Sequence, residues 1–375
     1  MPKTIRVTFV CRSENLSGGQ RVIAIYADRL TKRGYDVTVV LPKRMAQSFR
    51  TRARTFVNQG IWFGGATRNE PSYFRNASFK IRRLSHSGPV TDRDVPDADV
   101  IIASWWETAE WVAELGPSKG VKVYFIQGHE VHDHLPVPRS EATYRLPLHK
   151  IVVAPWLKGV MIKQYGDSTV DVVPNSVDRT QFFAVPRGKR PVPTVGFLYS
   201  TTPLKRLDLT FSALRIVQER IPQLRTVTFG STFPLPSLAP PKGTQFFRLP
   251  PQDEIRNIYA GCDAWITASR SEGFNLPALE AMACRTPVVS TRTGWPQDMV
   301  KSGWNGVLAD IDDVSGLAKG VEWILSLSDD EWRTLSANAY ATASAGSWEE
   351  STIMFEKALE HACLRAVRGE LIAVS

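Results

Sequence analysis

The stretch SRSEGFNLPALEAMACRTPVV, residues 269–289, constrains the fold more than any other part of this sequence. It follows an apolar run at 263–268 that is typical of a buried strand, and it ends in a second apolar run. Gly273 permits a bend after the first strand, and Pro277 suits the first turn of a helix. The pattern therefore predicts a strand, a turn, a helix and a strand, with free backbone amides at the helix N-terminus.

Two carboxylates flank this helix start. Unpaired amides and the helix dipole favour an anion such as phosphate, yet Glu272 precedes the helix and Glu280 follows eight positions later. A carboxylate accepts two hydrogen bonds, and the diol of a ribose supplies both donors. The combination points to a nucleotide ligand, and to one that carries a sugar. The alternative is that Glu272 is a loop charge and Glu280 faces solvent.

The segment EGFNLPALE resembles the Glu-x7-Glu signature of the retaining glycosyltransferases of family 4, the glycosyl transferases group 1. The resemblance continues through TPVV and NGVL, and it covers residues 175–350 better than the first half. It implies an α/β fold of the GT-B type, with two doubly wound Rossmann-like domains facing a central cleft. It further implies that Glu280 binds the donor ribose and that Glu272 lies near the donor sugar and phosphates. The residues whose amides would bind the same donor are Gly273, Phe274, Asn275 and Leu276.

The length of 375 residues suits two or three domains. With the resemblance, we expect an acceptor-binding domain at 1–175, a Pro-rich linker at 176–193 and a nucleotide-sugar domain at 194–347. A last helix at 348–375 would cross back to the first domain. The sequence has no apolar run of transmembrane length and no cleavable signal pattern, and its four cysteines form no CxxC. These features favour a cytoplasmic protein without a zinc site.

Two places in the first half are candidates for substrate contacts. Gly18 and Gly19 lie between a predicted strand at 5–10 and a helix, where the family has a diglycine loop facing the donor phosphates and the acceptor. A plain βα turn is the alternative. His129 follows a strand at 122–126 and matches a family histidine beneath the transferred sugar. It would hydrogen-bond a sugar hydroxyl or stabilise developing charge. A structural histidine is the alternative, and HEVHDH does not have the spacing of a zinc site.

The loop after a strand at 194–198 departs from the family pattern. The family places an arginine directly after the glycine and a lysine about six residues later, and both neutralise the donor pyrophosphate. Here Lys205 fits the lysine, but Phe197 occupies the arginine position. We expect Lys205 to stabilise the leaving group. Arg206 would compensate for the missing arginine, or the hydroxyls and amides of residues 200–202 would.

The net charge of +9 is concentrated in residues 41–83, where ten Lys and Arg face one acid. Aromatic residues are interleaved with them. Such a segment suits an anionic partner, either the head groups of a membrane surface or an acidic acceptor. Nucleic acid is disfavoured because no RNA-binding signature accompanies the segment. A solvated basic face is the other alternative.

Together these features predict a retaining, metal-independent glycosyltransferase with His129, Lys205 and Glu272 as its catalytic residues. It would move a sugar from a nucleotide diphosphate sugar to a hydroxyl of a polysaccharide, glycolipid or lipid-linked glycan. We expect no cofactor beyond the donor, a cytoplasmic location and contact with the inner face of the membrane through the basic segment. A nucleotide-sugar epimerase of the same fold, a phosphorylase and a non-catalytic anion- or membrane-binding module are the alternatives.

Overall fold

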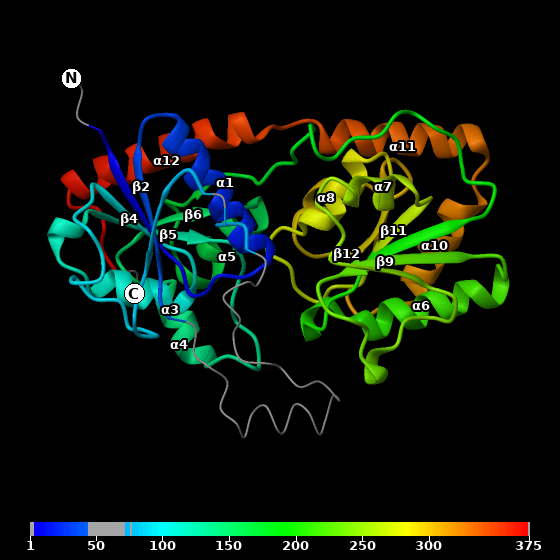
Figure 1. Cartoon of the computed structure of the whole chain (residues 1–375), viewed down its shortest axis with the longest axis horizontal. Helices are drawn as coiled ribbons and strands as arrows, with labels where there is room; N and C mark the ends of the chain where they lie inside the picture. Colours follow the sequence, from blue (N-terminus) through cyan, green and yellow to red (C-terminus); the bar gives the residue numbers. More distant parts are fainter. Residues whose placement is uncertain (1–3, 44–71, 76, 374–375) are drawn as a thin grey trace. The chain divides into compact units, whose positions relative to one another are not determined.

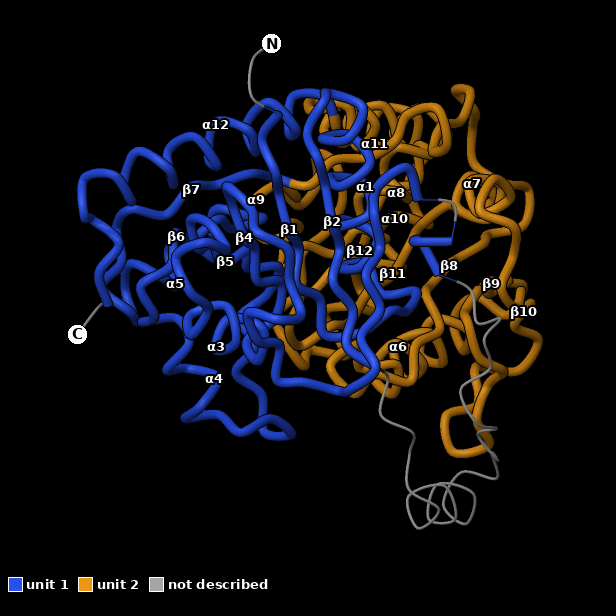
Figure 2. The backbone as a smooth tube through the Cα atoms, turned by 60° about the vertical axis from the view of Figure 1, so that its left-hand side comes forward, with its two compact units in different colours: residues 1–174, 349–375 blue, residues 175–348 orange. Residues whose placement is uncertain are grey.

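The computed structural model describes residues 4–43, 72–75 and 77–373. The chain divides into two compact units, shown in two colours in Figure 2. Unit 1 comprises residues 1–174 and 349–375, and unit 2 comprises residues 175–348. Most of the basic segment predicted to meet an anionic partner, residues 44–71, lies outside the described residues. None of the described helices combines the length and the apolar character needed to span a membrane.

Unit 1 contains, in the described part of the chain, a parallel sheet with the strand order β3-β2-β1-β4-β5-β6-β7. Its inner strands are apolar on both faces, as expected for a parallel sheet covered by helices. The strands are β1 (Arg6–Val10), β2 (Asp36–Leu41), β3 (Lys80–Arg83), β4 (Val100–Ala103), β5 (Val121–Ile126), β6 (His149–Val152) and β7 (Asp171–Val172).

Helices cover both faces of this sheet. Figure 1 shows α1 and α12 on one face and α3 and α4 on the other. Phe355 of α12 is fully buried and stacks on Tyr26 of α1, with ring centroids 4.3 Å apart. From residue 349 onward, α12 is therefore part of the core of unit 1. The helices are α1 (Gly18–Lys32), α3 (Trp106–Glu114), α4 (Val137–Thr143), α5 (Pro155–Tyr165) and α12 (Trp348–Val367).

Unit 2 contains a second parallel sheet, with the order β10-β9-β8-β11-β12-β13 among its described strands. Figure 1 shows α6 and α10 on one face and α7, α8 and α11 on the other. The strands are β8 (Thr194–Leu198), β9 (Arg225–Gly230), β10 (Gln245–Arg248), β11 (Ala264–Thr267), β12 (Val288–Thr291) and β13 (Gly306–Ala309). The helices are α6 (Leu207–Arg220), α7 (Ile255–Ala260), α8 (Leu276–Ala283), α9 (Trp295–Met299), α10 (Val314–Ser326) and α11 (Asp329–Ala343).

The segment 176–193, expected to be a linker, is part of unit 2. Asp263 is fully buried at the start of β11 and accepts hydrogen bonds from the amides of Arg190 and Thr194, both at 2.9 Å. The guanidinium of Arg187 lies 3.3 Å from the same carboxylate and stacks over the ring of Trp332. The charge that suggested a solvated linker thus has a buried partner. A buried carboxylate needs such partners, because burying it alone is costly.

A polar cluster joins α12 to β6 and β7. Asp171 accepts hydrogen bonds from His149 Nε2 at 2.9 Å and from His361 Nδ1 at 2.8 Å. Arg365 lies 3.1 Å from His149 Nδ1. Because a guanidinium only donates, His149 is neutral with its proton on Nε2. These histidines and Asp171 have the residue types of a divalent-metal site, but the Nε2 proton occupies the lone pair that a metal would need.

This cluster predicts a loss of stability in mild acid. Burial lowers the pKa of the fully buried His149. The unfolded chain therefore takes up a proton near pH 6.5 that the folded chain does not, and the free energy of unfolding falls as the pH drops below that value, by up to about 1.4 kcal/mol per pH unit. Burial alone would raise the pKa of Asp171, but the hydrogen bonds from His149 and His361 outweigh it, so the pKa is lowered and its contribution is lost only in stronger acid.

Urea unfolding at pH 7.5 and pH 5.5 measures this effect. The wild-type protein should lose more stability between the two values than His149→Gln, which keeps an acceptor for Arg365 but does not titrate. Equal losses of stability in the wild-type protein and in His149→Gln would contradict the assignment of the effect to His149.

Candidate functional site

Both sheets reverse their strand order at the first strand of the unit. β1 lies between β2 and β4, and β8 lies between β9 and β11. Ligands of open α/β sheets bind at such a point, beyond the carboxyl ends of the strands. The predicted site residues all follow these carboxyl ends. In unit 1 they are Gly18, Gly19 and His129, and in unit 2 they are Lys205, Arg206, Glu272, Gly273, Phe274, Asn275, Leu276 and Glu280.

The structure brings Lys205 and Glu272 together at the reversal point of unit 2. Lys205 Nζ lies 2.6 Å from Glu272 Oε1, although the two residues are 67 positions apart. Ser269 Oγ donates to the same carboxylate oxygen at 2.6 Å. The amide of Glu272 donates to Thr293 Oγ1 at 3.0 Å. A cation and a carboxylate are thus held side by side at the turn that precedes α8.

The chain bends at Gly273 and Phe274, as the sequence predicts for Gly273, and Asn275 then adopts a left-handed conformation just before α8. Asn275 has φ 77°, whereas Gly273 is not among the residues with positive φ. Asparagine tolerates this left-handed conformation, and its side-chain amide donates to Thr267 Oγ1 at 3.2 Å. In the described part of the chain, the amides of Phe274, Asn275 and Leu276 donate to no other group. They provide the unpaired donors that an anion requires.

Glu280 is buried within α8, and the solvent-facing alternative is therefore wrong. Its side chain is 6% exposed, and Tyr259 donates to Glu280 Oε2 at 2.9 Å. A buried carboxylate on a helix that begins at an anion-binding turn is unusual, because burial disfavours the charge. The tyrosine fixes one of its oxygens in a defined direction.

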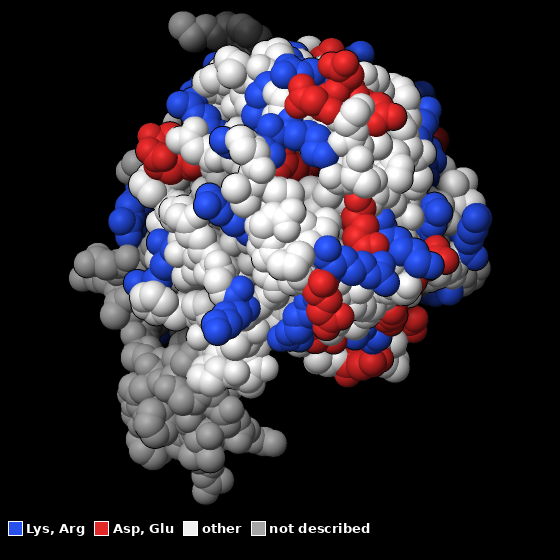
Figure 3. Space-filling model, turned by 90° about the vertical axis from the view of Figure 1, so that its right-hand side faces the viewer, with Lys and Arg blue, Asp and Glu red and all other residues white. Residues whose placement is uncertain are grey.

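Phe197 and Arg206 are the two residues that bear on the departure from the family pattern. Phe197 is fully buried and packs against Phe211, with ring centroids 5.5 Å apart, so its position belongs to the core. Arg206 forms ion pairs with Asp208 and Asp312. Its guanidinium is therefore already engaged, whereas Lys205 points to the turn. On the face shown in Figure 3, basic and acidic side chains likewise lie beside one another.

In unit 1, Gly18 and Gly19 form the first turn of α1 and do not precede the helix as predicted, because Ser17 caps it. Ser17 Oγ accepts from the amide of Gln20 at 3.4 Å. Gln127 donates from Nε2 to the carbonyl of Gly19 at 3.2 Å. The loops after β1 and β5 are therefore connected, and the diglycine turn lies near the segment that carries His129.

His129 is half-buried and lies 2.7 Å from the hydroxyl of Tyr165 through Nε2. Burial lowers the pKa of His129 to about 4, and His132 adds to this. The imidazole is therefore neutral at neutral pH. A neutral imidazole can hydrogen-bond a sugar hydroxyl, which is one of the two roles predicted for His129. The neighbouring Glu130 is buried and accepts from the amide of Trp106 at 2.9 Å.

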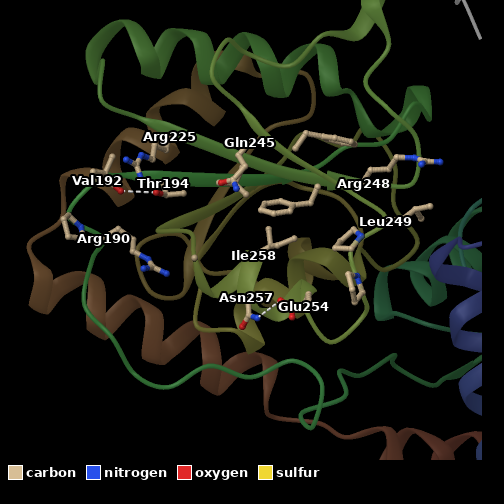
Figure 4. A pocket seen from close by; sticks show the side chains of 17 residues that line it. Arg190, Val192, Thr194, Arg225, Gln245, Arg248, Leu249, Glu254, Asn257 and Ile258 are labelled. Carbon is tan, nitrogen blue, oxygen red and sulfur yellow. Dashed lines mark hydrogen bonds between the residues drawn. The ribbon is translucent and has the colours of Figure 1, made fainter.

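A pocket of about 860 Å³ opens beside the loop 249–252, which follows β10 in unit 2 (Figure 4). Leu249, Pro250 and Pro251 line one end of it. Leu249 has φ 44°, so the chain turns sharply after β10. This loop is thus open to a planar group.

Sequence reasoning missed several residues that hold the site. Tyr259, Thr293 and Tyr165 each donate to or accept from a predicted site residue. None of them lies within the motif of its partner, and no local pattern marks them. Gly294 is a further case, because a Cβ there would lie 2.8 Å from the Cβ of Glu272 and 2.8 Å from the carbonyl oxygen of Phe274.

Residues 178–342 match the family model described as Glycosyl transferases group 1. The match covers less than half of the chain, and within it the sequence is similar to a group 1 glycosyltransferase domain. The D-inositol 3-phosphate glycosyltransferase of Corynebacterium jeikeium is 36% identical over 120 residues, which is 32% of this chain and 28% of that protein. The O-antigen chain mannosyltransferase B of Escherichia coli is 36% identical over 103 residues, 27% of this chain and 26% of that protein. The matched segments thus span less than a third of each relative's own length.

The whole chain has the GT-B fold predicted from the sequence. Anabaena HepE, solved in complex with UDP-glucose, superposes with a TM-score of 0.72 at 16% identity and covers 95% of this chain and 100% of its own. The sucrose-phosphate synthase of Thermosynechococcus elongatus gives a TM-score of 0.68 at 14% identity, covering 95% and 98%. The GT-B fold therefore accounts for both α/β units of the chain, including the unit that contains the group 1 match.

The contacts of Gly294 predict that the turn before α8 tolerates no side chain there. Gly294→Ala should lower the free energy of unfolding by about 1–3 kcal/mol, because the new Cβ meets backbone and the residue must keep φ 65°. Gly303→Ala is the matched control, since Gly303 has φ 82° but no atom within 4 Å of the place that a Cβ would take. Urea denaturation measures both. If Gly294→Ala and Gly303→Ala lower the free energy of unfolding equally, the steric contact of position 294 with the turn makes no contribution to the loss of stability.

Proposed function

We propose that this protein is a retaining glycosyltransferase of family 4 that transfers a sugar from a nucleotide diphosphate sugar to a hydroxyl acceptor. The observation that carries the proposal is the contact between Lys205 and Glu272 at the carboxyl edge of the unit 2 sheet, beside the open amides of the α8 turn. Glu280 lies one turn into α8, where its tyrosine-bound carboxylate suits the diol of the donor ribose. A phosphate, a sugar and a ribose then each have partners in one turn.

Lys205 and the α8 amides would stabilise the charge that grows on the leaving pyrophosphate. Groups held in place before the reaction are worth more than mobile ones, since they need not reorganise as charge develops. Metal independence is part of the proposal, because these donors supply the positive field. The Asp-x-Asp pair Asp97 and Asp99 lies at the amino end of β4, away from the carboxyl edge, and its members pair with Lys119 and Arg6.

His129 would hydrogen-bond a hydroxyl of the transferred sugar. Its low pKa of about 4 keeps the ring neutral, so it can donate from one nitrogen while the other meets Tyr165. We assign no side chain as general base. In the retaining mechanism that the resemblance implies, the leaving phosphate helps to deprotonate the acceptor on the same face of the sugar.

Unit 1 would bind the acceptor and unit 2 the donor. The neighbouring HepE structure holds UDP-glucose, which makes uridine diphosphate sugars the first donors to test. The relatives named for an O-antigen chain and for an inositol phosphate favour a glycan, glycolipid or lipid-linked acceptor in polysaccharide biosynthesis. A cytoplasmic location with peripheral contact to the membrane, made by the segment 41–83, completes the proposal.

Nucleotide binding tests the donor site directly. A thermal-shift panel of nucleoside diphosphates and their sugars should give one base that raises the melting temperature, because ligand binding stabilises the folded state. Glu280→Gln should weaken binding of that nucleotide by about 10- to 100-fold, the value of a charged hydrogen bond. Glu219→Gln, on the exposed face of α6, is the matched control and should leave binding unchanged. The absence of any shift across the panel would overturn the donor site.

Turnover tests the leaving-group role. Lys205→Met should lower kcat by about 10²- to 10³-fold, as for the loss of one transition-state donor. Lys319→Met, exposed on α10, should keep full activity. EDTA should leave the wild-type rate unchanged, and activity that is lost with EDTA and restored by a divalent ion would refute metal independence. Donor conversion without any acceptor would instead favour the epimerase.

A further inference from the structure

The pocket of about 860 Å³ in unit 2 extends far beyond the loop 249–252. It follows β10 along its whole length, from Gln245 to Leu249, a distance of about 13 Å at 3.3 Å per residue. Figure 4 shows Arg190 and Arg225 at the end opposite Arg248 and Leu249. The far end therefore lies at the amino edge of the sheet, where the donor site has no part.

The groove exists because α7 does not cover the edge of the sheet. This helix is short, and its Tyr259 packs against Trp265 with ring centroids 4.5 Å apart and against Phe229 at 5.7 Å. These contacts hold α7 over β11 and over Phe229 near the carboxyl end of β9. The edge strand β10 and the earlier part of β9 instead line the pocket, together with Pro191, Pro250 and Pro251.

Apolar side chains line much of the groove. Val227 and Phe247 are only half-buried, although both belong to the sheet. Ile258 of α7 and Val192 face them across the space. Phe246, the neighbour of Phe247 on β10, packs on the opposite face of the sheet against Tyr199. An apolar channel of this kind favours a hydrocarbon chain over water.

The amino end of the groove is basic. Arg190 and Arg225 are exposed, and in the described part of the chain neither guanidinium has a carboxylate partner. The lining carries one acid, Glu254, which accepts from Asn257 at 3.0 Å. At the other end, Arg248 stacks over Phe233 at 4.6 Å and is directed away from the channel. Two uncompensated cations at one end of an apolar channel match an anion that carries a hydrocarbon chain.

We propose that this groove binds an anionic amphiphile, with its carboxylate or phosphate head on Arg190 and Arg225 and its chain along Val227, Phe247 and Ile258. The head-group end of the groove is separate from the donor site, because it lies at the opposite edge of the sheet from Lys205 and Glu272. The inference does not depend on the proposed transferase activity. A fatty acid and a lipid phosphate share this chemistry, and the experiment distinguishes them.

Calorimetric titration of the full chain with short amphiphiles below their micellar concentration tests the site. Decanoate, decyl phosphate, decanol and inorganic phosphate separate the head group from the chain. At least one of the two charged amphiphiles should bind ten times more tightly than decanol, and inorganic phosphate should not bind measurably. The tighter of decanoate and decyl phosphate identifies the source as a fatty acid or a lipid phosphate. Equal affinity for decanol and both anions would overturn the proposal, as would no binding of either anion at millimolar concentration.

Variants locate the binding. The double variant Arg190→Glu with Arg225→Glu should weaken binding of the preferred amphiphile at least tenfold. Phe247→Ser should also weaken binding, because it removes an apolar contact with the hydrocarbon chain of the amphiphile. Arg215→Glu, an exposed arginine on α6, makes the same kind of charge change away from the groove and should have no effect. A nucleotide thermal shift that is retained by all variants would show that unit 2 is folded. If the double variant and the control bind equally well, the amphiphile is bound elsewhere and the proposal fails.

Discussion

All strand pairings in the described sheets are parallel, and this constraint determines where polar chemistry is possible. A parallel sheet is covered on both faces, so strands such as Val100–Ala103 and Val288–Thr291 are buried throughout. Charged side chains must then lie in the loops beyond the strand ends. The carboxyl ends of β8 and β11 lie side by side, which is why Lys205 meets Glu272 across 67 positions of sequence.

The cations at this edge are held by carboxylates of the protein itself. Lys205 pairs with Glu272, while Arg206 and Arg270 both pair with Asp312. The donor phosphate of the proposed function would therefore replace one anionic partner of Lys205 by another, and the side chain of Lys205 would need little additional ordering. This lowers the entropic cost of binding. It also favours ligands that offer Glu272 a hydrogen-bond donor in return, because a half-buried carboxylate that loses its cation needs a new partner.

The fold and much of the site could be predicted from local patterns, and the remainder depends on contacts that no local pattern encodes. The 269–289 segment predicted the strand, turn and helix correctly, because its apolar runs, glycine and proline act within a few residues. It did not predict the left-handed conformation of Asn275, whose side-chain amide donates to Thr267 across the turn. Arg187 was assigned to a linker because its partner, Asp263, is 76 positions away. Tyr259 was missed for the same reason.

The discontinuity of unit 1 has a consequence for how the protein is made. Unit 2 is one continuous segment, so a ribosome completes it before residues 349–375 emerge. Until then, the sheet face formed by Phe9, Tyr26 and Phe125 lacks the ring of Phe355 that buries it. Unit 1 of the nascent chain therefore exposes an aromatic surface until α12 is made. Such exposure favours chaperone binding or aggregation. Slow synthesis of the central segment would prolong that exposure, and early termination before α12 would make it permanent.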